Sequence, residues 1–282
     1  MIEIRDKHLE RFVYEHFEGL KNKLRDFPAG KYSLKEIITA KPDKLHEIAI
    51  WAKDKTDEYK FMIGKYKNFT TKKKEYDAYD LARKLNINVC PYCNINPTYT
   101  VITENGKKIT RPEFDHFYDK DTYPILALSF YNLIPSCHTC NATLKGQESF
   151  SNLTHINPYS ESFDKVAKFH LKIGDSSFYY SSTGFELKLK SEDEKAKNNI
   201  KSFELEALYE NHKEIALELI QKEAIYNESY LDELLTQYEG TLFKNREDLQ
   251  RLISGGYVSE DEINKRPLSK LIKDISQELE LI

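Results

Sequence analysis

Apolar residues recur at helical spacing over the first eighty-odd residues of the chain. A first helix is predicted between Ile4 and Leu24, where apolar side chains return every three or four positions until the segment 27–30 ends the run. Ser33 is a good N-cap for a second helix, which Pro42 interrupts or restarts before the pattern continues to Trp51. A third helix is predicted over about 71–85.

The pattern changes after these helices, where β-branched and aromatic residues replace the helical repeat. Residues 99–103 and 108–110 are predicted strands, and the Asn-Gly pair at 105–106 is the turn signal between them. We expect this hairpin to return to Asp115 and His116.

The remaining pattern predicts short elements followed by a helical C-terminal part. A loop with a short apolar run covers 119–132, and a short helix is predicted from Asn141 to Lys145. Beyond Pro158 we expect three strands and then helices, at about 168–173, 177–182, 185–190, 194–243 and 268–281.

These elements predict an α+β protein with three regions. The expected boundaries give an N-terminal helical region at 1–84, a core at 85–159, and a C-terminal region of a small β-sheet and helices at 160–282.

Composition indicates a soluble, folded chain. Of its 282 residues, 40% are hydrophobic and 31% are charged, a balance that excludes a disordered protein. The longest apolar runs, such as Ile125–Leu128, are far too short to cross a bilayer. Charges at positions 3, 5 and 6 are incompatible with a secretory signal, so we expect a cytoplasmic protein.

Charge is unevenly distributed although the formal net charge is only −4. Between Lys60 and Lys84 there are eight Lys or Arg against three acids, and this stretch includes Lys72, Lys73 and Lys74. Such a stretch could bind a phosphate backbone, although a solvated helix face is the commoner explanation of a charge run. The part from Glu192 to the end is acidic.

The four cysteines form two pairs of identical spacing. Cys90 and Cys93 make one pair, Cys137 and Cys140 make the other, and no cysteine is left over. A reducing cytoplasm disfavours disulfides, whereas two residues between thiolates let both face one ion. We therefore predict a structural Zn²⁺ site, with two redox pairs or incidental thiols as the alternative.

Residues suited to phosphodiester hydrolysis lie between and beside these pairs. A histidine such as His116 can take a proton from water near neutral pH. Oxygen ligands suit Mg²⁺, which needs only one or two protein groups. Asp115, at the predicted strand end, and Asn141, at the predicted helix start, would supply such oxygens.

The combined pattern resembles the HNH endonuclease motif in its zinc-stapled, ββα-metal form. The residues that carry the resemblance are Phe114-Asp115-His116-Phe117, Asn132-Leu133-Ile134-Pro135-Ser136-Cys137-His138-Thr139-Cys140-Asn141 and Lys145-Gly146. The three signature positions are filled by His116, Asn132 and Asn141, with asparagine in place of the second histidine. The resemblance covers about 60 residues and implies an endonuclease.

The resemblance also implies roles for single residues. His116 would be the general base, and Asp115 and Asn141 would hold the catalytic cation. Asn132 would brace the loop that orients His116. Some members have a histidine four residues after the last motif position, where this chain has Lys145, and this departure favours Mg²⁺ or Mn²⁺.

Two residues near the motif are candidates for contact with nucleic acid. Lys145, which stands where some relatives have a metal-ligating histidine, could instead contact phosphate. Tyr92 lies inside the first cysteine pair, where its ring could stack on a base, although tyrosines at such spacing more often pack.

A looser resemblance extends to one HNH subgroup. Short motifs near Tyr123-Pro124, 156–159 and 196–212 look like the HNH proteins encoded beside an ATPase in Septu and retron-associated anti-phage systems. The resemblance implies an effector nuclease controlled by an ATPase partner. The helical first eighty residues and the acidic C-terminal third are the expected partner contacts.

Two alternatives remain open from the sequence. Nothing in it reads the 2′-hydroxyl, so the substrate could be RNA, including tRNA, although family frequency favours DNA. The chain could also be a zinc-stapled, catalytically inactive module that binds nucleic acid or protein. The filled set of Asp115, His116 and Asn141 favours the enzyme.

Overall fold

The chain folds into two compact units in the computed structural model, which describes residues 2–71 and 75–282. Unit 1 is Met1–Ser162 and unit 2 is Phe163–Ile282. The regions 1–84 and 85–159 that the sequence suggested both belong to unit 1. The run Lys72–Lys74 lies outside the described residues. No described helix is both long and apolar enough to cross a bilayer.

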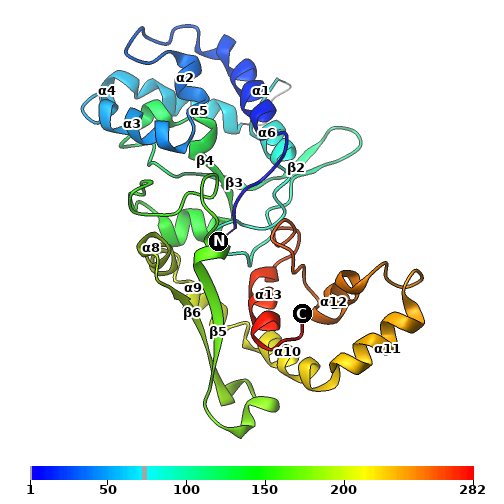
Figure 1. Cartoon of the computed structure of the whole chain (residues 1–282). Helices are drawn as coiled ribbons and strands as arrows, with labels where there is room; N and C mark the ends of the chain where they lie inside the picture. The colour runs from blue at the N-terminus through cyan, green and yellow to red at the C-terminus, as the bar shows by residue number, and fades with distance from the viewer. Residues whose placement is uncertain (1, 72–74) are drawn as a thin grey trace. The chain divides into compact units, whose positions relative to one another are not determined.

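Unit 1 begins with short helices (Figure 1). They are α1 (Leu9–Lys21), the 3₁₀ turn η1 (Asn22–Leu24), α2 (Leu34–Ile38), α3 (Pro42–Ala52), α4 (Thr56–Tyr59), α5 (Phe61–Thr70) and α6 (Ala78–Leu85). Ser33 caps α2 as predicted, in a capping box with Glu36. Pro42 starts a new helix, because proline is favoured at the first helical position.

The helix expected over 71–85 starts later than predicted. The side chain of Asp77 accepts a hydrogen bond from the backbone N–H of Tyr79, which makes Asp77 the N-cap of α6. The sequence pattern also missed α5, because Gly64 and mixed polar residues blur its helical repeat.

Two antiparallel hairpins follow in unit 1. The predicted turn joins β1 (Val101–Ile102) to β2 (Lys108–Thr110), so this hairpin is confirmed with shorter strands. The next strand, β3 (Glu113–His116), pairs with β4 (Leu133–Ser136), and Asp115 lies opposite Ile134. The sequence did not predict β4. All four of its residues are buried, so the alternation typical of a half-buried strand is missing.

The segment between β3 and β4 is folded against the helices. It contains the 3₁₀ turns η2 (Pro124–Leu126) and η3 (Phe130–Asn132), and each of α2 to α5 packs on one of these turns. After β4 comes η4 (Thr139–Lys145), a π-helix in which the N–H of Gly146 bonds the carbonyl of Asn141, five residues earlier. The N-terminal helices therefore support the loop that joins β3 and β4.

Unit 2 consists of one long hairpin and a set of helices. Its elements are α7 (Phe163–Val166), β5 (Ala167–Ile173), η5 (Ser176–Tyr179), η6 (Ser182–Gly184), β6 (Phe185–Ser191), α8 (Glu194–Ser202), α9 (Leu205–Glu210), α10 (Lys213–Ile225), α11 (Glu228–Tyr238), α12 (Arg246–Ser254) and α13 (Ser269–Glu278). β5 and β6 pair antiparallel in full register.

One prediction for unit 2 is wrong. Residues 177–182 form 3₁₀ turns and not a strand, because Asp175 and Ser181 cap successive turns with their side chains. The helical stretch predicted over 194–243 is confirmed, and it is divided into four helices, since Glu204 adopts φ +44° and Asn227 caps a new start. Helices and three two-stranded sheets together confirm the α+β class.

Candidate metal centre and active site

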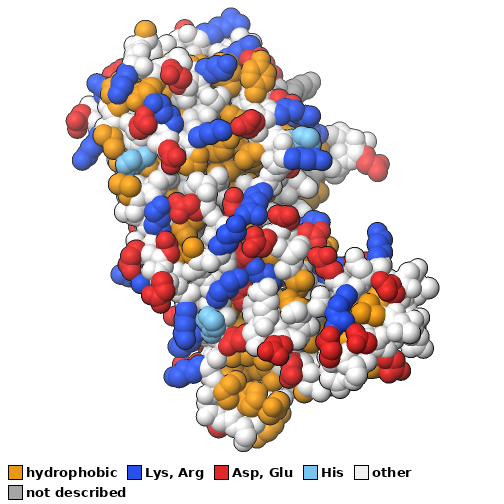
Figure 2. All heavy atoms as spheres, in the orientation of Figure 1, with side chains coloured by type: hydrophobic (Ala, Val, Ile, Leu, Met, Phe, Trp, Pro, Cys, Tyr) orange, Lys and Arg blue, Asp and Glu red, His pale blue; other side chains and the backbone are white. Residues whose placement is uncertain are grey.

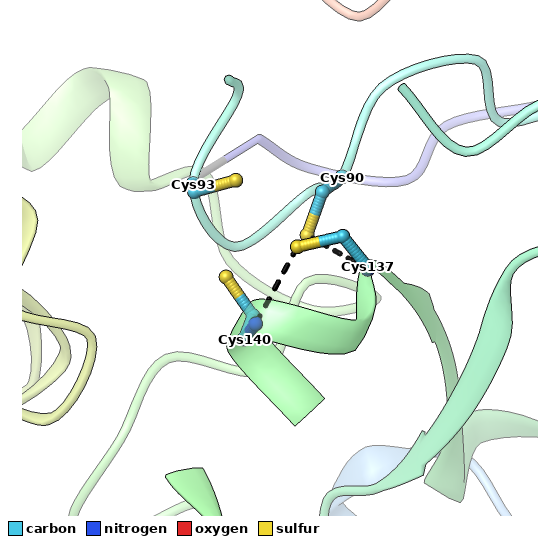
Figure 3. A group of neighbouring side chains, drawn as sticks. All are labelled: Cys90, Cys93, Cys137 and Cys140. Carbon is cyan, nitrogen blue, oxygen red and sulfur yellow. Dashed lines mark hydrogen bonds between the residues drawn. The ribbon is translucent and has the colours of Figure 1, made fainter. Parts of the chain in front are cut away.

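The four cysteines form one buried cluster in unit 1. Their sulfur atoms all lie within 4.8 Å of one another, and none of the four residues is exposed (Figure 3). Cys90 and Cys93 come from the turn after α6, whereas Cys137 and Cys140 bracket the end of β4 and the start of η4. The predicted convergence of the two pairs is confirmed.

Backbone amides prepare this cluster for a metal. The N–H of Cys137 donates to the sulfur of Cys90, and the N–H of Cys140 donates to the sulfur of Cys137, each at 3.4 Å. The pKa of Cys137 is held well below its usual value, because the other three thiols hydrogen bond to its sulfur. Such donors stabilise thiolate, which is the form that binds metal.

The cluster has the chemistry and size of a structural metal site. A tetrahedral zinc ion with four thiolates at about 2.3 Å holds its sulfurs about 3.8 Å apart. Sulfurs that all lie within 4.8 Å of one another are close enough to share such an ion. Four buried thiols without oxygen ligands fit a soft, structural metal such as zinc.

Asp115 lies in the buried contact between β3 and η4. One carboxylate oxygen, Oδ2, accepts a hydrogen bond from the hydroxyl of Tyr92 at 2.6 Å. The other, Oδ1, is 2.9 Å from the ammonium nitrogen of Lys145. Burial raises the pKa of Tyr92 well above its usual value. The hydroxyl therefore stays protonated and donates a hydrogen bond to the carboxylate.

Lys145 and Tyr92, the two predicted nucleic-acid contacts, are both buried. The Lys145 ammonium also donates to the carbonyl of His116 at 2.8 Å and lies 5.0 Å from the centre of the Phe150 ring. Tyr92 is 0% exposed and Lys145 is 4% exposed. Neither side chain is available for base stacking or phosphate contact in this structure.

His116 points away from Asp115 into the segment that joins β3 and β4. Its Nε2 lies 3.0 Å from the carbonyl of Ala127, and its ring meets the ring of Tyr66 edge-on at 4.3 Å. Burial lowers the pKa of His116 to about 4, so the ring is neutral at pH 7. With the proton on Nε2 facing the carbonyl, Nδ1 carries the lone pair, and no described residue hydrogen bonds to it.

Asn132 ties together the two ends of the loop between β3 and β4. Its Oδ1 accepts from the N–H of Tyr118 at 2.7 Å, and its Nδ2 donates to the carbonyls of Tyr118 at 3.0 Å and Leu126 at 3.1 Å. Backbone groups thereby take up three of the four hydrogen bonds that the Asn132 side chain can make. The bracing geometry that the sequence resemblance implied for Asn132 is compatible with these contacts.

Asn141 meets a residue that the sequence analysis did not single out. Its Nδ2 donates to Glu113 at 2.7 Å, and the second oxygen of that carboxylate lies 2.8 Å from Nδ1 of His138. Glu113 precedes Asp115 by two residues, so both carboxylates lie on one face of β3. This spacing was the signal available in the sequence.

The structure thus brings Asp115, Asn141 and Lys145 to the contact of β3 with η4 without showing a shared cation site, and it places the side chains of His116 and Asn132 in the segment between β3 and β4. Glu113 and Asp115 on β3 bond Asn141 and Lys145 on η4, in that order. Asp115 and Asn141 have different partners. Apart from the four cysteines, the described residues contain no group of three or more histidine, cysteine or carboxylate ligands close enough to hold one ion.

Comparison with known proteins gives one partial match. A stretch of 71 residues is 38% identical to the Septu protein PtuB of Bacillus thuringiensis, which is 25% of this chain and 24% of that protein. The matched stretch is therefore about a quarter of that relative's length. No protein-family model matches the chain, and no solved structure matches it.

Proposed function

We propose that this chain is a divalent-metal-dependent endonuclease of the HNH type that hydrolyses phosphodiester bonds, with DNA as the favoured substrate. The observation that carries the proposal is the contact of β3 with η4. There Asp115 supplies a carboxylate and Asn141 an amide near the four-thiol cluster, while His116, the next residue of β3, supplies a neutral histidine on the other side of the strand. Phosphodiester hydrolysis uses these three kinds of group.

The partial similarity to a Septu protein supports a role in anti-phage defence. In this proposal the chain is the effector nuclease of such a system, and an ATPase is its partner. Helices α1–α6 and the acidic helices of unit 2 are the proposed surfaces for that partner. Co-purification of the chain with an ATPase encoded beside it tests this part.

Each candidate residue has one role in the proposed hydrolysis. His116 accepts a proton at Nδ1 from the attacking water, while the carbonyl of Ala127 holds Nε2–H and fixes the ring. Asn132 keeps the segment that bears this carbonyl closed, through its bond to Leu126. Asp115 and Asn141 would hold Mg²⁺ or Mn²⁺, which supplies positive charge to the phosphate and the departing oxygen.

The bond changes follow from these positions. The oxygen of the attacking water bonds to phosphorus, one of its protons goes to His116, and the bond from phosphorus to the 3′ oxygen breaks. The departing 3′ oxygen takes a proton from solvent water, and His116 later returns its proton to solvent. The products carry a 5′-phosphate and a 3′-hydroxyl. The four-thiol cluster takes no part in these steps, since it lies at the start of η4 and holds that helix to the turn at Cys90.

The test compares two buried histidines with similar surroundings. His116→Ala is expected to lower divalent-dependent cleavage by about a hundredfold or more, the usual contribution of a general base. His16 is the matched control: it is buried, its pKa is also lowered to about 4 by burial, and its Nε2 lies 2.9 Å from the carbonyl of Leu128, next to Ala127. His16→Ala is expected to cleave at the parental rate at temperatures where it is folded.

The measurement uses plasmid DNA and a structured RNA as parallel substrates, with the ATPase partner present, and zinc content as the folding control. Equal cleavage by the parent and His116→Ala would contradict the proposed role. Cleavage of the RNA alone would leave the chemistry and change the substrate class.

One observation favours a second candidate, an inactive module that binds nucleic acid or protein. The carboxylate of Asp115 is already bound to a buried lysine, as it would be in a purely structural pair. Under this alternative the parent cleaves neither substrate with its partner present, and His116→Ala binds the partner and nucleic acid as the parent does.

A further inference from the structure

We propose that Lys145 sets the metal requirement of the candidate site: its ammonium group occupies Asp115, and a divalent cation binds only by displacing it. The inference rests on the proposed function, since it takes Asp115 as a cation ligand. It makes Lys145 a positioning and selectivity residue that acts through Asp115, and it gives a buried lysine next to the candidate site a definite task.

The surroundings of Lys145 are those of a bound cation. The ammonium has two strong acceptors, Oδ1 of Asp115 at 2.9 Å and the carbonyl of His116 at 2.8 Å. The face of the Phe150 ring lies on a further side, at 5.0 Å from the nitrogen. Water reaches almost none of this side chain. An acidic oxygen, a carbonyl and a π face together form a site for one positive charge.

The two oxygens of Asp115 are held in different ways. Oδ2 is fixed at 2.6 Å by the neutral hydroxyl of Tyr92, which leaves the negative charge in place. Oδ1 is bound by the charged group of Lys145. If a divalent cation takes Oδ1, the hydroxyl still orients the carboxylate. The lysine is therefore the exchangeable partner, and the tyrosine is the permanent one.

Lysine and a divalent cation cannot both stay on Oδ1. Two charges of the same sign within a few ångströms in a buried site repel strongly, because there is little water to screen them. A cation at Asp115 must therefore move the ammonium away. The lysine lowers the apparent affinity for metal by competition, so only a cation at sufficient concentration opens the site.

Lys145 lies at the end of its helix, next to an exposed segment. It is the last residue of η4, and Gly146 follows in the left-handed region at φ +51°. Residues 146–149 are exposed. A rotation of the Lys145 side chain towards this segment would break no backbone hydrogen bond of the π-helix, and Lys145 is not part of the contact between Asn141 and Glu113.

The experiment measures Mn²⁺ binding to the full-length, zinc-loaded chain by electron paramagnetic resonance of the free ion. Lys145→Met keeps the length of the side chain and removes its charge. It is expected to bind Mn²⁺ about tenfold or more tightly than the parent, since a charge-assisted competitor is gone. The matched control is Lys108→Met, which removes a lysine bound at 2.5 Å to the buried Asp77 of the same unit. Its Mn²⁺ affinity should equal that of the parent.

Asp115→Asn separates failure of this inference from failure of the proposed function. If Asp115→Asn weakens Mn²⁺ binding and Lys145→Met does not tighten it, the inference about Lys145 is wrong while the cation site stands. If Asp115→Asn binds Mn²⁺ as the parent does, or folded Lys145→Met binds none, Asp115 is not a cation ligand and both proposals fail.

A second measurement on the parent covers the case in which Lys145→Met does not fold. Lys145 should resist an amine-acylating reagent in metal-free buffer and become labelled as Mn²⁺ is added, as read by mass spectrometry of peptides. Lys270, which is buried in unit 2, should stay protected throughout. Unchanged protection of Lys145 at Mn²⁺ concentrations that support cleavage overturns the inference.

Discussion

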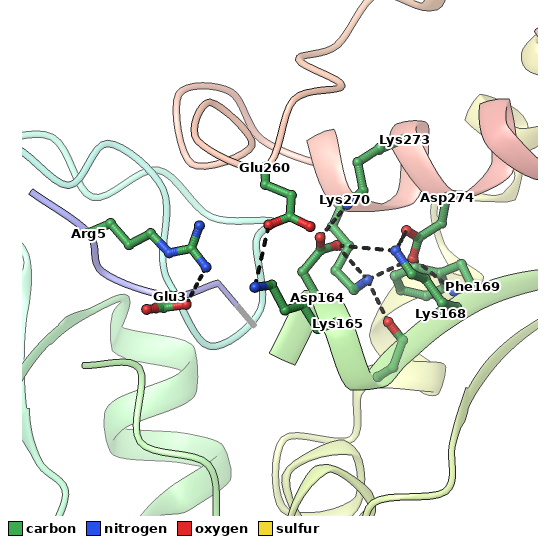
Figure 4. A network of polar contacts seen from close by, with 11 residues as sticks. Glu3, Arg5, Asp164, Lys165, Lys168, Phe169, Glu260, Lys270, Lys273 and Asp274 are labelled. Atoms are coloured by element: carbon green, nitrogen blue, oxygen red, sulfur yellow. Dashed lines mark hydrogen bonds and ion pairs between the residues drawn. The ribbon is translucent and has the colours of Figure 1, made fainter. Parts of the chain in front are cut away.

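Both units bury lysine against aspartate, but they do so in different ways. Unit 1 has a single pair in the contact between β3 and η4, Lys145 with Asp115. Unit 2 has a network around α13, shown in Figure 4. Its members are Asp164, Lys168, Lys270, Lys273 and Asp274.

The network of unit 2 joins three elements. Lys270 on α13 lies 2.7 Å from Asp274, 3.0 Å from Asp164 before β5, and 2.7 Å from the carbonyl of Ala167. Asp274 also accepts the backbone N–H of Phe169 at 2.9 Å. Asp164, Asp274 and Lys270 each have several partners, so no single ion can replace one of them. Such redundancy is typical of a structural role.

The pair in unit 1 lacks this redundancy. The charge of Asp115 is compensated by one ammonium group, and a divalent cation offers the same compensation with a different ligand geometry. The number of partners, and not burial, therefore distinguishes a pair that can open from a network that cannot. Unit 1 also contains all four cysteines of the chain.

The largest expected effect comes from removal of the structural metal. Cys140→Ser, or a strong chelator on the parent, should unfold the segment from Cys90 to Lys145, since binding of a structural zinc contributes about 10–16 kcal/mol to folding. Hydrogen exchange followed by mass spectrometry should show this loss in unit 1 while α13 and β5 stay protected. Equal loss in both units would mean that unit 2 depends on the metal as well.

A smaller effect is expected when the network of unit 2 is broken. Asp164→Asn leaves Lys270 and Lys273 with too little negative charge, and loss of one partner of a buried pair costs about 3–5 kcal/mol. Urea denaturation, followed by hydrogen exchange in α13, measures this loss in the free energy of unfolding of unit 2. The control is Asp232→Asn, which breaks an exposed pair with Arg246 and should cost about 1 kcal/mol or less.

The smallest effect per side chain is a difference in acid sensitivity. Burial lowers the pKa of His16 and of His155, both in unit 1, to about 4. Because the folded pKa is depressed, the stability that each contributes is complete above its unfolded value near 6.5 and is lost as pH falls towards 4. Each is worth roughly 3 kcal/mol over this window.

Unit 2 should respond at lower pH. Burial raises the pKa of Asp164, but Lys270 and Lys273 outweigh it and hold that pKa well below its usual range. The stability that Asp164 contributes to unit 2 is lost only below about pH 4. Half-buried His212 also lies in unit 2, and because burial lowers its pKa, its contribution is lost in the same pH range as those of His16 and His155. Trp51, the chain's one tryptophan, reports urea unfolding of unit 1. An unchanged midpoint between pH 6.5 and 4.5 would contradict this prediction, and His16→Gln should flatten the profile.

The cysteine spacing predicted more of the site than any other feature. Cys90, Cys93, Cys137 and Cys140 converge as expected, because two-residue spacing leaves each pair facing one point. The turn at Asn105-Gly106 likewise fixed a hairpin, since only a few residue pairs accept its backbone angles. Local chemistry determined both features.

Contacts between distant segments could not be predicted in the same way. Lys145 was expected to contact phosphate, yet it binds Asp115, 30 residues earlier. Tyr92 was a candidate for stacking on a base, with packing as the commoner role of tyrosines, and it is buried against the same carboxylate. The position of a polar residue in the sequence does not indicate which distant residue it will contact in the fold. Strand β4 was missed for a related reason, because full burial removes the alternation that marks a strand.

The π-helical form of η4 limits how this part of the chain can change in length. Cys140 is fixed by the thiol cluster and Lys145 by Asp115, so the number of residues between them is set by one wide turn. Deleting a single residue would restore ordinary α-helical winding and carry the lysine off its carboxylate. The hairpin tip at 103–107 is exposed, so insertions should be tolerated there.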